Sequence, residues 1–365
     1  MQDYTLTAVR GPAKIPTRRI LIAAGILAVC TLPFAASDYF LFQLTLIAAN
    51  SIALMGLNLL TGYNGQISLG HSFFFAVGAY TTAILTADHG WPYLLTLIPA
   101  FVLTFLLGFL FGIPALRLEG LYLALVTLAL AVVAPPLIKR FSDLTGGSQG
   151  KLVEKPEAPA WTGLADDQWR YYVAVAIAVA LFVIVRNLVR GRVGRALIAI
   201  RDNHIAAEAM GINPAIFKTT TFAISTAYAG VAGGLYALTV GFVAPESFSP
   251  LVGIEFLTGA VVGGLATIIG PVIGALFTYF IPEYASQLNP SAPNVLYGII
   301  LILVVIAAPG GVVGLITRAR DALIDRSPRS ADTGSSDTTP EAPTPASRVE
   351  VPSASHTGAT RENPE

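Results

Sequence analysis

"YLLTLIPAFVLTFLLGFLFGIPAL", residues 93–116, decides the fold of this chain because it holds no charged residue and very few polar ones. An α-helix rises about 1.5 Å per residue, so the run is long enough to cross the roughly 30 Å hydrocarbon core of a bilayer. A helix that is apolar on every side lies either in the core of a large protein or in a membrane. The run therefore predicts a membrane-spanning helix.

Other runs of similar character recur along the chain. Hydrophobic residues make up 54% of the sequence, charged residues only 12%, and the mean hydropathy is +0.67. These values exclude a water-soluble globular domain. We expect an all-α, polytopic helical membrane protein with about eight full spans. Besides residues 93–116, the runs lie at 20–37, 40–60, 67–87, 120–138, 171–185, 219–243 and 294–317.

One further apolar stretch, residues 251–282, is broken in its middle by "GGLATIIGP", Gly263–Pro271. Each half has about 15 residues, which at about 1.5 Å per residue falls short of a bilayer core. We favour a re-entrant pair of half-helices that enters from the outer side, and two full but short crossings are the alternative. Non-helical backbone at this depth must be buried in protein or line a cavity.

Basic residues predict the orientation. With the N-terminus inside, the inner segments carry fifteen Lys and Arg, and the outer segments carry five. Cytoplasmic loops carry the excess of positive charge, so both termini are expected in the cytoplasm. The predicted organisation is a cytoplasmic tail over 1–19, a transmembrane permease domain over 20–317, and a cytoplasmic tail over 318–365. Within the domain, 186–218 is a cytoplasmic coupling loop and 139–170 an outer loop.

The end of the chain differs in composition. From about residue 327 it is rich in Pro, Ser, Thr and Ala and almost lacks large apolar side chains. Such a segment cannot bury enough apolar surface to offset the loss of conformational entropy on ordering. We therefore expect it to be disordered.

The sequence shows no catalytic motif. It lacks a GxxxxGK[ST] phosphate-binding loop, its four histidines are scattered without metal-ligand spacing, and no Ser/His/Asp set is evident. We predict neither an enzyme site nor a metal site, no cofactor in this chain and no nucleic-acid partner. Charges lie at the ends of the apolar runs, whereas ion-driven carriers place them deep in the membrane. Uphill transport would therefore draw its energy from a partner.

Glycine pairs at GxxxG spacing recur in the apolar runs. They lie at Gly108 and Gly112, at Gly259 and Gly263, and at Gly270 and Gly274. Such pairs let helix backbones approach closely. They predict a dense bundle, or one that pairs with a second membrane subunit.

A polar stretch separates two of the apolar runs: "GLNLLTGYNGQISLGHSFFFAVGAYTTAIL", residues 56–85. One interpretation is a tight inner turn whose polar residues are satisfied by neighbouring helices. The other is a broken helix whose exposed backbone and polar side chains meet a polar solute. The candidate transport path comprises Asn64, Gly65, Gln66, Ser68, His71 and, from a later run, Thr127.

A second polar stretch is "VGRALIAIRDNHIAAEAMGINPAIFK", residues 193–218. Good helix formers predict a helix over Arg195–Arg201. Asp202 or Asn203 can cap a second short helix, His204–Met210, and Gly211 suits a left-handed stop. Asn213 and Pro214 then fit the start of the next membrane helix. The stretch is predicted to be two short helices at the inner surface, joined rigidly to a span.

Two functions fit this helix pair. It can be an interfacial amphipathic helix whose basic face lies on anionic lipid. It can also be a docking element for a soluble protein, since the small residues Ala206, Ala207 and Ala209 permit close approach.

The segment "IAAEAMG", Ile205–Gly211, resembles the EAA loop of ABC-transporter permeases, whose pattern is Glu-Ala-Ala, three residues, then Gly. Ala206, Ala207 and Gly211 match, whereas Ile205 stands where the Glu is expected. Over about residues 40–317 the chain is similar to branched-chain amino acid ABC permeases of the LivM type. The other stretches that carry this resemblance are "GLNLLTGYNGQISLGHSFFFAVGAY", "RLEGLYLALVTLAL", "LTGGSQG", "GRALIAIRDNHIAAEAMGIN" and "LYGIILILVVIAAPGGVVGL".

The resemblance implies an importer subunit in the bacterial inner membrane that pairs with a second, homologous permease. Two cytoplasmic ATPase subunits would bind ATP and Mg²⁺, and an extracytoplasmic solute-binding protein would deliver Leu, Ile or Val. The residues implied in coupling to the ATPase are Arg201, Asp202, Ala206, Ala207, Glu208 and Gly211.

Two alternatives stay open at this point. A charge-poor pathway suits an aliphatic amino acid, which "VTL" at 126–128 favours, but permeases for urea or short amides belong to the same broader family. From a different class, the chain can be a self-sufficient channel or secondary carrier with 193–218 as a lipid-surface helix.

Overall fold

The structure is a computed structural model. It describes residues 25, 27, 29–118, 120–288, 298–303, 306, 310–315 and 317–318. These residues are mostly helical, which confirms the predicted all-α membrane class. The tail 1–19, the expected disorder from about residue 327 and parts of the runs 20–37 and 294–317 lie outside the described residues.

Five helices of the described part are long and apolar enough to cross a membrane, while the number of about eight spans stays a prediction. These are α2 (Asp38–Leu57, continued by a π-helix, Asn58–Tyr63), α4 (Tyr93–Ala115), α5 (Leu121–Arg140), α7 (Asp166–Arg190) and α10 (Pro214–Val240). Three shorter helices accompany them: α3 (His71–Ala87), α11 (Pro250–Gly263) and α12 (Gly270–Leu288).

The remaining elements are short and connect the long helices. The helices are α6 (Ser142–Thr145), α8 (Arg192–Asp202) and α9 (His204–Ala209), with 3₁₀ turns at Gly147–Gln149 and Pro245–Phe248. Strands β1 (Lys151–Leu152) and β2 (Phe242–Val243) pair antiparallel, with Lys151 opposite Val243. This pairing fastens the predicted outer loop 139–170 to the end of α10.

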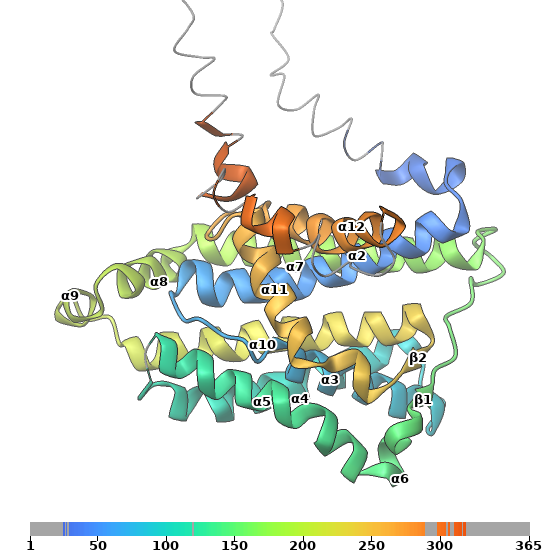
Figure 1. The fold of residues 1–365 in the computed structure, drawn as a ribbon, viewed down its shortest axis with the longest axis horizontal. Coiled ribbons are helices and arrows are strands. Elements are labelled where there is room, and N and C mark those ends of the chain that lie inside the picture. Colours follow the sequence, from blue (N-terminus) through green and yellow to red (C-terminus); the bar gives the residue numbers. More distant parts are fainter. Residues whose placement is uncertain are drawn as a thin grey trace, which may run out of the picture. The chain divides into compact units, whose positions relative to one another are not determined.

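Helix α10 forms the centre of the bundle and packs against α2, α3 and α4 (Figure 1). Its sequence is rich in Gly, Ala, Ser and Thr, which lets neighbouring backbones come close. A Cβ on Gly78 of α3 would collide with the backbone of Gly230, and one on Gly108 of α4 would collide with Thr226. The predicted close approach at Gly108 and Gly112 is therefore confirmed.

The apolar stretch 251–282 is interrupted where the sequence predicts it. Helix α11 ends at Gly263, and α12 begins at Gly270. The two GxxxG pairs pack on each other, because Gly259 lies against Gly274 and Gly263 against Gly270. The two helices therefore run antiparallel as a tight hairpin, and its depth in a bilayer stays a prediction.

Candidate functional site

The predicted transport path contains a break in the helical chain. After the π-helix Asn58–Tyr63, the backbone leaves helical geometry until α3 begins at His71. Burial alternates along the break: Asn64, Gln66 and Ser68 are buried, whereas Gly65 and Ile67 are exposed. The polar side chains therefore point into the bundle, and the backbone with Ile67 forms the outward face.

Neighbouring helices satisfy most of these polar groups. His71 is fully buried, with Nε2 at 2.8 Å from Ser225 Oγ and Nδ1 at 3.3 Å from Ser68 Oγ. Ser225 Oγ donates to Gly56 O at 2.6 Å, so it accepts from His71 Nε2–H, and Nδ1 in turn accepts from Ser68. His71 is thus a neutral, hydrogen-bonded histidine that joins α3 to α10 and α2.

Thr127 holds the same break from α5. Its Oγ1 accepts from Leu69 N at 3.0 Å and donates to Ala124 O at 3.0 Å. Gly70 packs against the Thr127 carbonyl so closely that a Cβ would lie 2.6 Å from its oxygen. The helix is therefore broken, and most of its polar groups are satisfied by neighbours, while contact of this break with a polar solute stays a prediction.

Asn64 is the exception. Its Nδ2 donates to Gln66 Oε1 at 2.8 Å, but Oδ1 is buried with no hydrogen-bond partner in the described part of the chain. Gln66 is held further by Thr61 Oγ1, which donates to Gln66 O at 3.0 Å. Asn64 lines a polar cavity of about 210 Å³ together with residues of α8 and α10.

Asn58 is the first residue of the π-helix. Its side chain connects this helix to the non-helical segment between α11 and α12. Its Nδ2 donates to Thr267 O at 2.7 Å, and its Oδ1 accepts from Ala266 N at 2.9 Å. Ala266 has a φ of +56°, a left-handed conformation that is costly for a residue with a Cβ. The sequence prediction omitted Asn58 from the path, although an amide side chain inside an apolar run was a usable signal.

The predicted coupling loop forms the two capped helices expected of it. Helix α8 begins earlier than predicted, at Arg192, and α9 ends at Ala209. Of the two candidate caps, Asn203 is the one used, since its side chain accepts from Ala206 N at 3.0 Å. Gly211 has a φ of +82°, and Asn213 caps α10 by accepting from Ala215 N at 3.0 Å.

The helix pair is anchored to the path by α8. Leu197 is fully buried and clusters with Leu59 and Tyr63 of the π-helix. Arg201 Nη1 donates to Gly62 O at 2.8 Å, and its side chain covers Gly65. Asp202 pairs with the same guanidinium at 3.0 Å. The structure thus joins Arg201 and Asp202 to Asn64 and Gly65, which the sequence placed in separate groups.

The other predicted coupling residues lie on α9 and its end. Ala206, Glu208 and Gly211 are exposed, whereas Ala207 is buried beneath them. Two large apolar side chains are exposed beside them, Ile205 at 69% and Met210 at 84%. An apolar groove of about 620 Å³ runs between α8, α9 and the start of α10. Most residues that line the groove are apolar, and Arg192, Arg195 and Asp202 are the charged ones among them.

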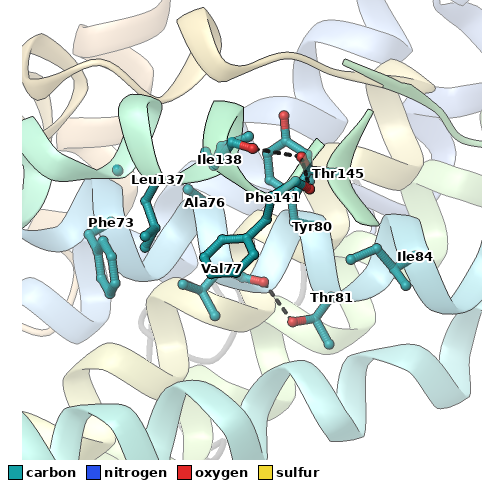
Figure 2. Close-up of a pocket in the computed structure, with 11 residues that line it drawn as sticks. Phe73, Ala76, Val77, Tyr80, Thr81, Ile84, Leu137, Ile138, Phe141 and Thr145 are labelled. Atoms are coloured by element: carbon teal, nitrogen blue, oxygen red, sulfur yellow. Dashed lines mark hydrogen bonds between the residues drawn. The ribbon is translucent and has the colours of Figure 1, made fainter. Parts of the chain in front are cut away.

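A separate, apolar pocket of about 180 Å³ lies between α3 and α5 (Figure 2). Its threonines are turned to backbone carbonyls: Thr81 donates to Val77 O and Thr145 to Ile138 O, both at 2.7 Å. Phe73, Leu137 and Phe141 supply apolar walls. The pocket can hold an aliphatic group but offers little to a charged one.

Within the described part of the chain, no three His, Cys, Asp or Glu side chains gather as metal ligands would. The candidate path consists of amide, hydroxyl, imidazole and backbone groups, and the ion pair of Arg201 and Asp202 lies beside it. Such groups can form hydrogen bonds with a polar solute, and whether they do so stays a prediction.

Comparisons with known proteins agree with this architecture. The family described as "branched-chain amino acid transport system / permease component" matches residues 39–307. The high-affinity branched-chain amino acid transport system permease protein LivM of Escherichia coli is 32% identical over 325 residues, covering 83% of this chain and 76% of the relative. The LivH permease protein of the same system type and organism is 25% identical over 299 residues, covering 76% and 96%.

A further relative is similar over a shorter part of the chain. The probable branched-chain amino acid transport permease protein LivM of Methanocaldococcus jannaschii is 26% identical over 237 residues, covering 60% of this chain and 68% of the relative. No solved structure gives a significant match. Because the family match spans most of the helical bundle, the chain belongs to the family of permease components of branched-chain amino acid transport systems.

Proposed function

We propose that this permease carries branched-chain amino acids into the cell and that partner subunits supply the energy by hydrolysing ATP. The similar LivM and LivH proteins are named as permeases of high-affinity branched-chain amino acid transport systems, which supports this substrate class. The membrane is taken to be the bacterial inner membrane, with both termini in the cytoplasm. An extracytoplasmic binding protein would deliver the solute at the opposite face.

Helices α8 and α9 are the proposed contact for the ATPase subunits. They lie in residues 186–218, the inner segment with the largest number of Lys and Arg, and the positive-inside rule assigns such segments to the cytoplasm. Ile205 on α9 and Met210, which directly follows α9, are exposed as apolar anchors, and Glu208 lies between them in the sequence. Clustered apolar anchors with a charged rim are typical of protein interfaces.

The observation that carries the proposal is the bond from Arg201 to Gly62 O. It connects the surface helix pair directly to the π-helix, and Asn58 connects the π-helix to the break between α11 and α12. π-Helices are rare and often mark functional positions. A displacement of α8 would therefore be transmitted through these hydrogen bonds to the π-helix and the break that follows it, and to the break between α11 and α12.

A second permease is the proposed partner within the membrane. Helix α5 leaves a row of large apolar side chains exposed, at Leu121, Tyr122, Leu125 and Val126. The same helix carries Thr127, which holds the break at Leu69. A partner seated on this face of α5 would lie beside the candidate path.

The test uses the reconstituted transporter with its second permease, both ATPase subunits and the binding protein. Ala206→Asp on α9 is expected to abolish ATPase docking, because it places a charge at a close contact. Arg201→Gln is expected to leave docking and ATP hydrolysis intact but to lower leucine uptake about tenfold or more, since it removes the bond to Gly62.

Ala160→Asp, at an exposed position in the outer loop, is the matched control and should change neither docking nor uptake. Uptake that continues without any ATPase subunit would contradict the proposal. So would an Ala206→Asp transporter that docks its ATPase and transports normally.

A further inference from the structure

Helix α11 carries a single charged residue, Glu255, in an otherwise apolar sequence. Glu255 lies near one end of its apolar run in the sequence, but contacts on either side of it place it deep in the bundle. Before it, a Cβ on Gly253 would collide with Leu69 O in the break. After it, the ring of Phe256 lies 5.4 Å from the ring of Phe75. Glu255 is therefore at the level where α3 begins.

The start of α3 lies about halfway along the spanning helix α10. Its first residue, His71, lies 2.8 Å from Ser225 Oγ, and Ser225 is near the middle of α10. Glu255 is therefore close to the middle of the membrane rather than at its edge. Ionisable side chains at this depth are costly and rare, and they mark the paths of solutes or ions.

The carboxyl group of Glu255 is available to a ligand. Its side chain is exposed, and within the part of the chain that the structure describes it forms no ion pair and no hydrogen bond. Leu251 and Ile254 are exposed on the same side of α11, and Thr258 follows one turn later. This face of α11 therefore presents one negative charge among aliphatic side chains.

The position of α11 favours a solute as the partner of this charge. Charged groups inside a membrane are paired or face a water-filled path, and lipid headgroups lie at the edges of the hydrocarbon core. Helix α11 is too short to cross the bilayer, and broken helices of this kind surround solute sites in transporters. It packs against α3 and α5, which border the candidate path. In Figure 1, α11, α5 and the connection from α2 to α3 lie on the side that faces the viewer.

We propose that Glu255 binds the ammonium group of the transported amino acid midway across the membrane. The attraction between an ammonium group and a carboxylate is strong where water is scarce. Leu251 and Ile254 offer an apolar contact to the aliphatic side chain of the solute. Urea and other neutral solutes form no ion pair with Glu255, so the site favours an amino acid. This inference rests on the proposed function, which supplies the solute.

The first test asks whether water reaches this face of α11. Thr258→Cys is made in a Cys30→Ser background, because Cys30 is an exposed free thiol. The transporter, with its second permease and both ATPase subunits, is assembled in nanodiscs without binding protein. A charged methanethiosulfonate is expected to label Thr258→Cys about tenfold faster or more than Val179→Cys on the exposed face of α7, because thiolates form poorly in lipid. Equal labelling rates would overturn the proposal.

The second test asks which group of the solute is bound. Leucinol keeps the ammonium group of leucine and lacks its carboxylate, whereas 4-methylpentanoate keeps the carboxylate and lacks the ammonium group. Leucine and leucinol are expected to slow the labelling of Thr258→Cys, and 4-methylpentanoate should need about tenfold higher concentrations for the same effect. Equal protection by 4-methylpentanoate or by urea would overturn the proposal. This comparison leaves Glu255 unchanged, so it decides the question even where a variant fails to assemble.

Substitution of Glu255 assigns the effect to this side chain. Glu255→Gln keeps the size and removes the charge, and it is expected to raise the leucine concentration for half protection about tenfold. Glu255→Asp keeps the charge and should stay within about threefold. Ala160→Cys, in the outer loop, is the labelling control, and leucine should not change its rate.

Two results with these variants would contradict the proposal. One is unchanged leucine protection in Glu255→Gln. The other is a Glu255→Gln transporter that loses its second permease while leucinol and 4-methylpentanoate protect the unsubstituted site equally. That result would assign the carboxylate to a contact between subunits.

The two hypotheses fail in different ways. If the ATPase subunits neither dock nor hydrolyse ATP, the proposed function fails. If the transporter hydrolyses ATP and imports leucine while leucine leaves the labelling of Thr258→Cys unchanged, only the ammonium site at Glu255 fails.

Discussion

Helices α7 and α10 have similar lengths but opposite places in the molecule. In the most apolar window of each, 11% of residues are buried in α7 and 83% in α10, although α7 is the more hydrophobic of the two. In a water-soluble protein this order would be reversed. Lipid accepts large apolar side chains as readily as a protein core does. Hydropathy therefore does not determine which helix lies inside the bundle.

Close packing of helix surfaces determines which helix lies inside the bundle. Helix α10 carries Gly230, Gly233 and Gly234, and each of them lies against α3 or α4 within the reach of a Cβ. Helix α7 offers Val179, Val183 and Ile184 as exposed, bulky side chains. Small residues thus mark contacts between helices, and large ones mark surfaces that face lipid or another subunit.

The largest effect is expected where two backbones touch. Gly78→Val would drive a side chain into the Gly230 carbonyl, which cannot yield without moving α10, and is expected to destabilise the protein by about 4 kcal/mol or more. Thermal unfolding in detergent measures this. The matched change on α7, Ala180→Val, should stay within about 0.5 kcal/mol. A Gly78→Val protein as stable as the unsubstituted protein would contradict the close packing of α3 on α10.

A charge on the exposed face of α7 tests what that face meets. Val179 is 55% exposed near the middle of the helix, and Val179→Arg is expected to disfavour membrane insertion by about 2.5–3.5 kcal/mol. The inserted fraction in microsomes measures this. Glu157→Arg in the outer loop is the control and should insert normally. Normal insertion of Val179→Arg would mean that this face of α7 contacts water and not lipid.

Removing a hydroxyl inside the bundle should lower the unfolding free energy more than removing one at its surface. Ser225→Ala on α10 leaves His71 Nε2 without its partner and is expected to cost about 1–2 kcal/mol in unfolding free energy. Tyr172→Phe on α7 removes a bond to Cys30 O and is expected to cost less than about 0.5 kcal/mol. The reverse order in unfolding measurements would argue against α10 as the centre.

The smallest effect is expected outside the membrane. Lys139 pairs with Glu246 at 2.8 Å in an exposed position, and this hydrogen bond lowers the pKa of the Glu246 carboxyl. A lowered pKa stabilises the fold above the ordinary carboxyl pKa, and that contribution is lost as pH falls through the lowered value. Glu246→Gln should therefore lower the melting temperature slightly at neutral pH and leave it unchanged at a pH below the lowered pKa, where the carboxyl of the native protein is protonated. A loss of stability that persists at that low pH would contradict this expectation.

Local patterns in the sequence predict much of the fold. The apolar runs mark the spans, "GGLATIIGP" marks the break between α11 and α12, and Gly211 and Asn213 mark the end of one helix and the start of the next. Each of these signals depends on residues within a few positions of one another. Helix length, glycine conformation and capping are local properties, which explains why they were predictable.

Contacts between distant residues were not predictable in this way. Asn58 meets Ala266 and Thr267, and Arg201 meets Gly62, across more than a hundred residues of chain. The sequence placed Arg201 in a coupling group and Asn64 in a path group, and only the structure brings them to one cavity. Whether either residue acts in transport stays a prediction.

The sequence by itself determined a helical membrane protein, the places where its helices break, and the capped helix pair at one surface. It did so because each segment that spans a bilayer must form its own backbone hydrogen bonds as a helix. The apolar runs of the local sequence therefore mark such segments. The tertiary structure decided that the small-residue helix α10 lies at the centre, and that Asn58 and Arg201 join the breaks to the surface helices. Those choices depend on which helix surfaces fit each other, and shape complementarity exists only once the helices are side by side.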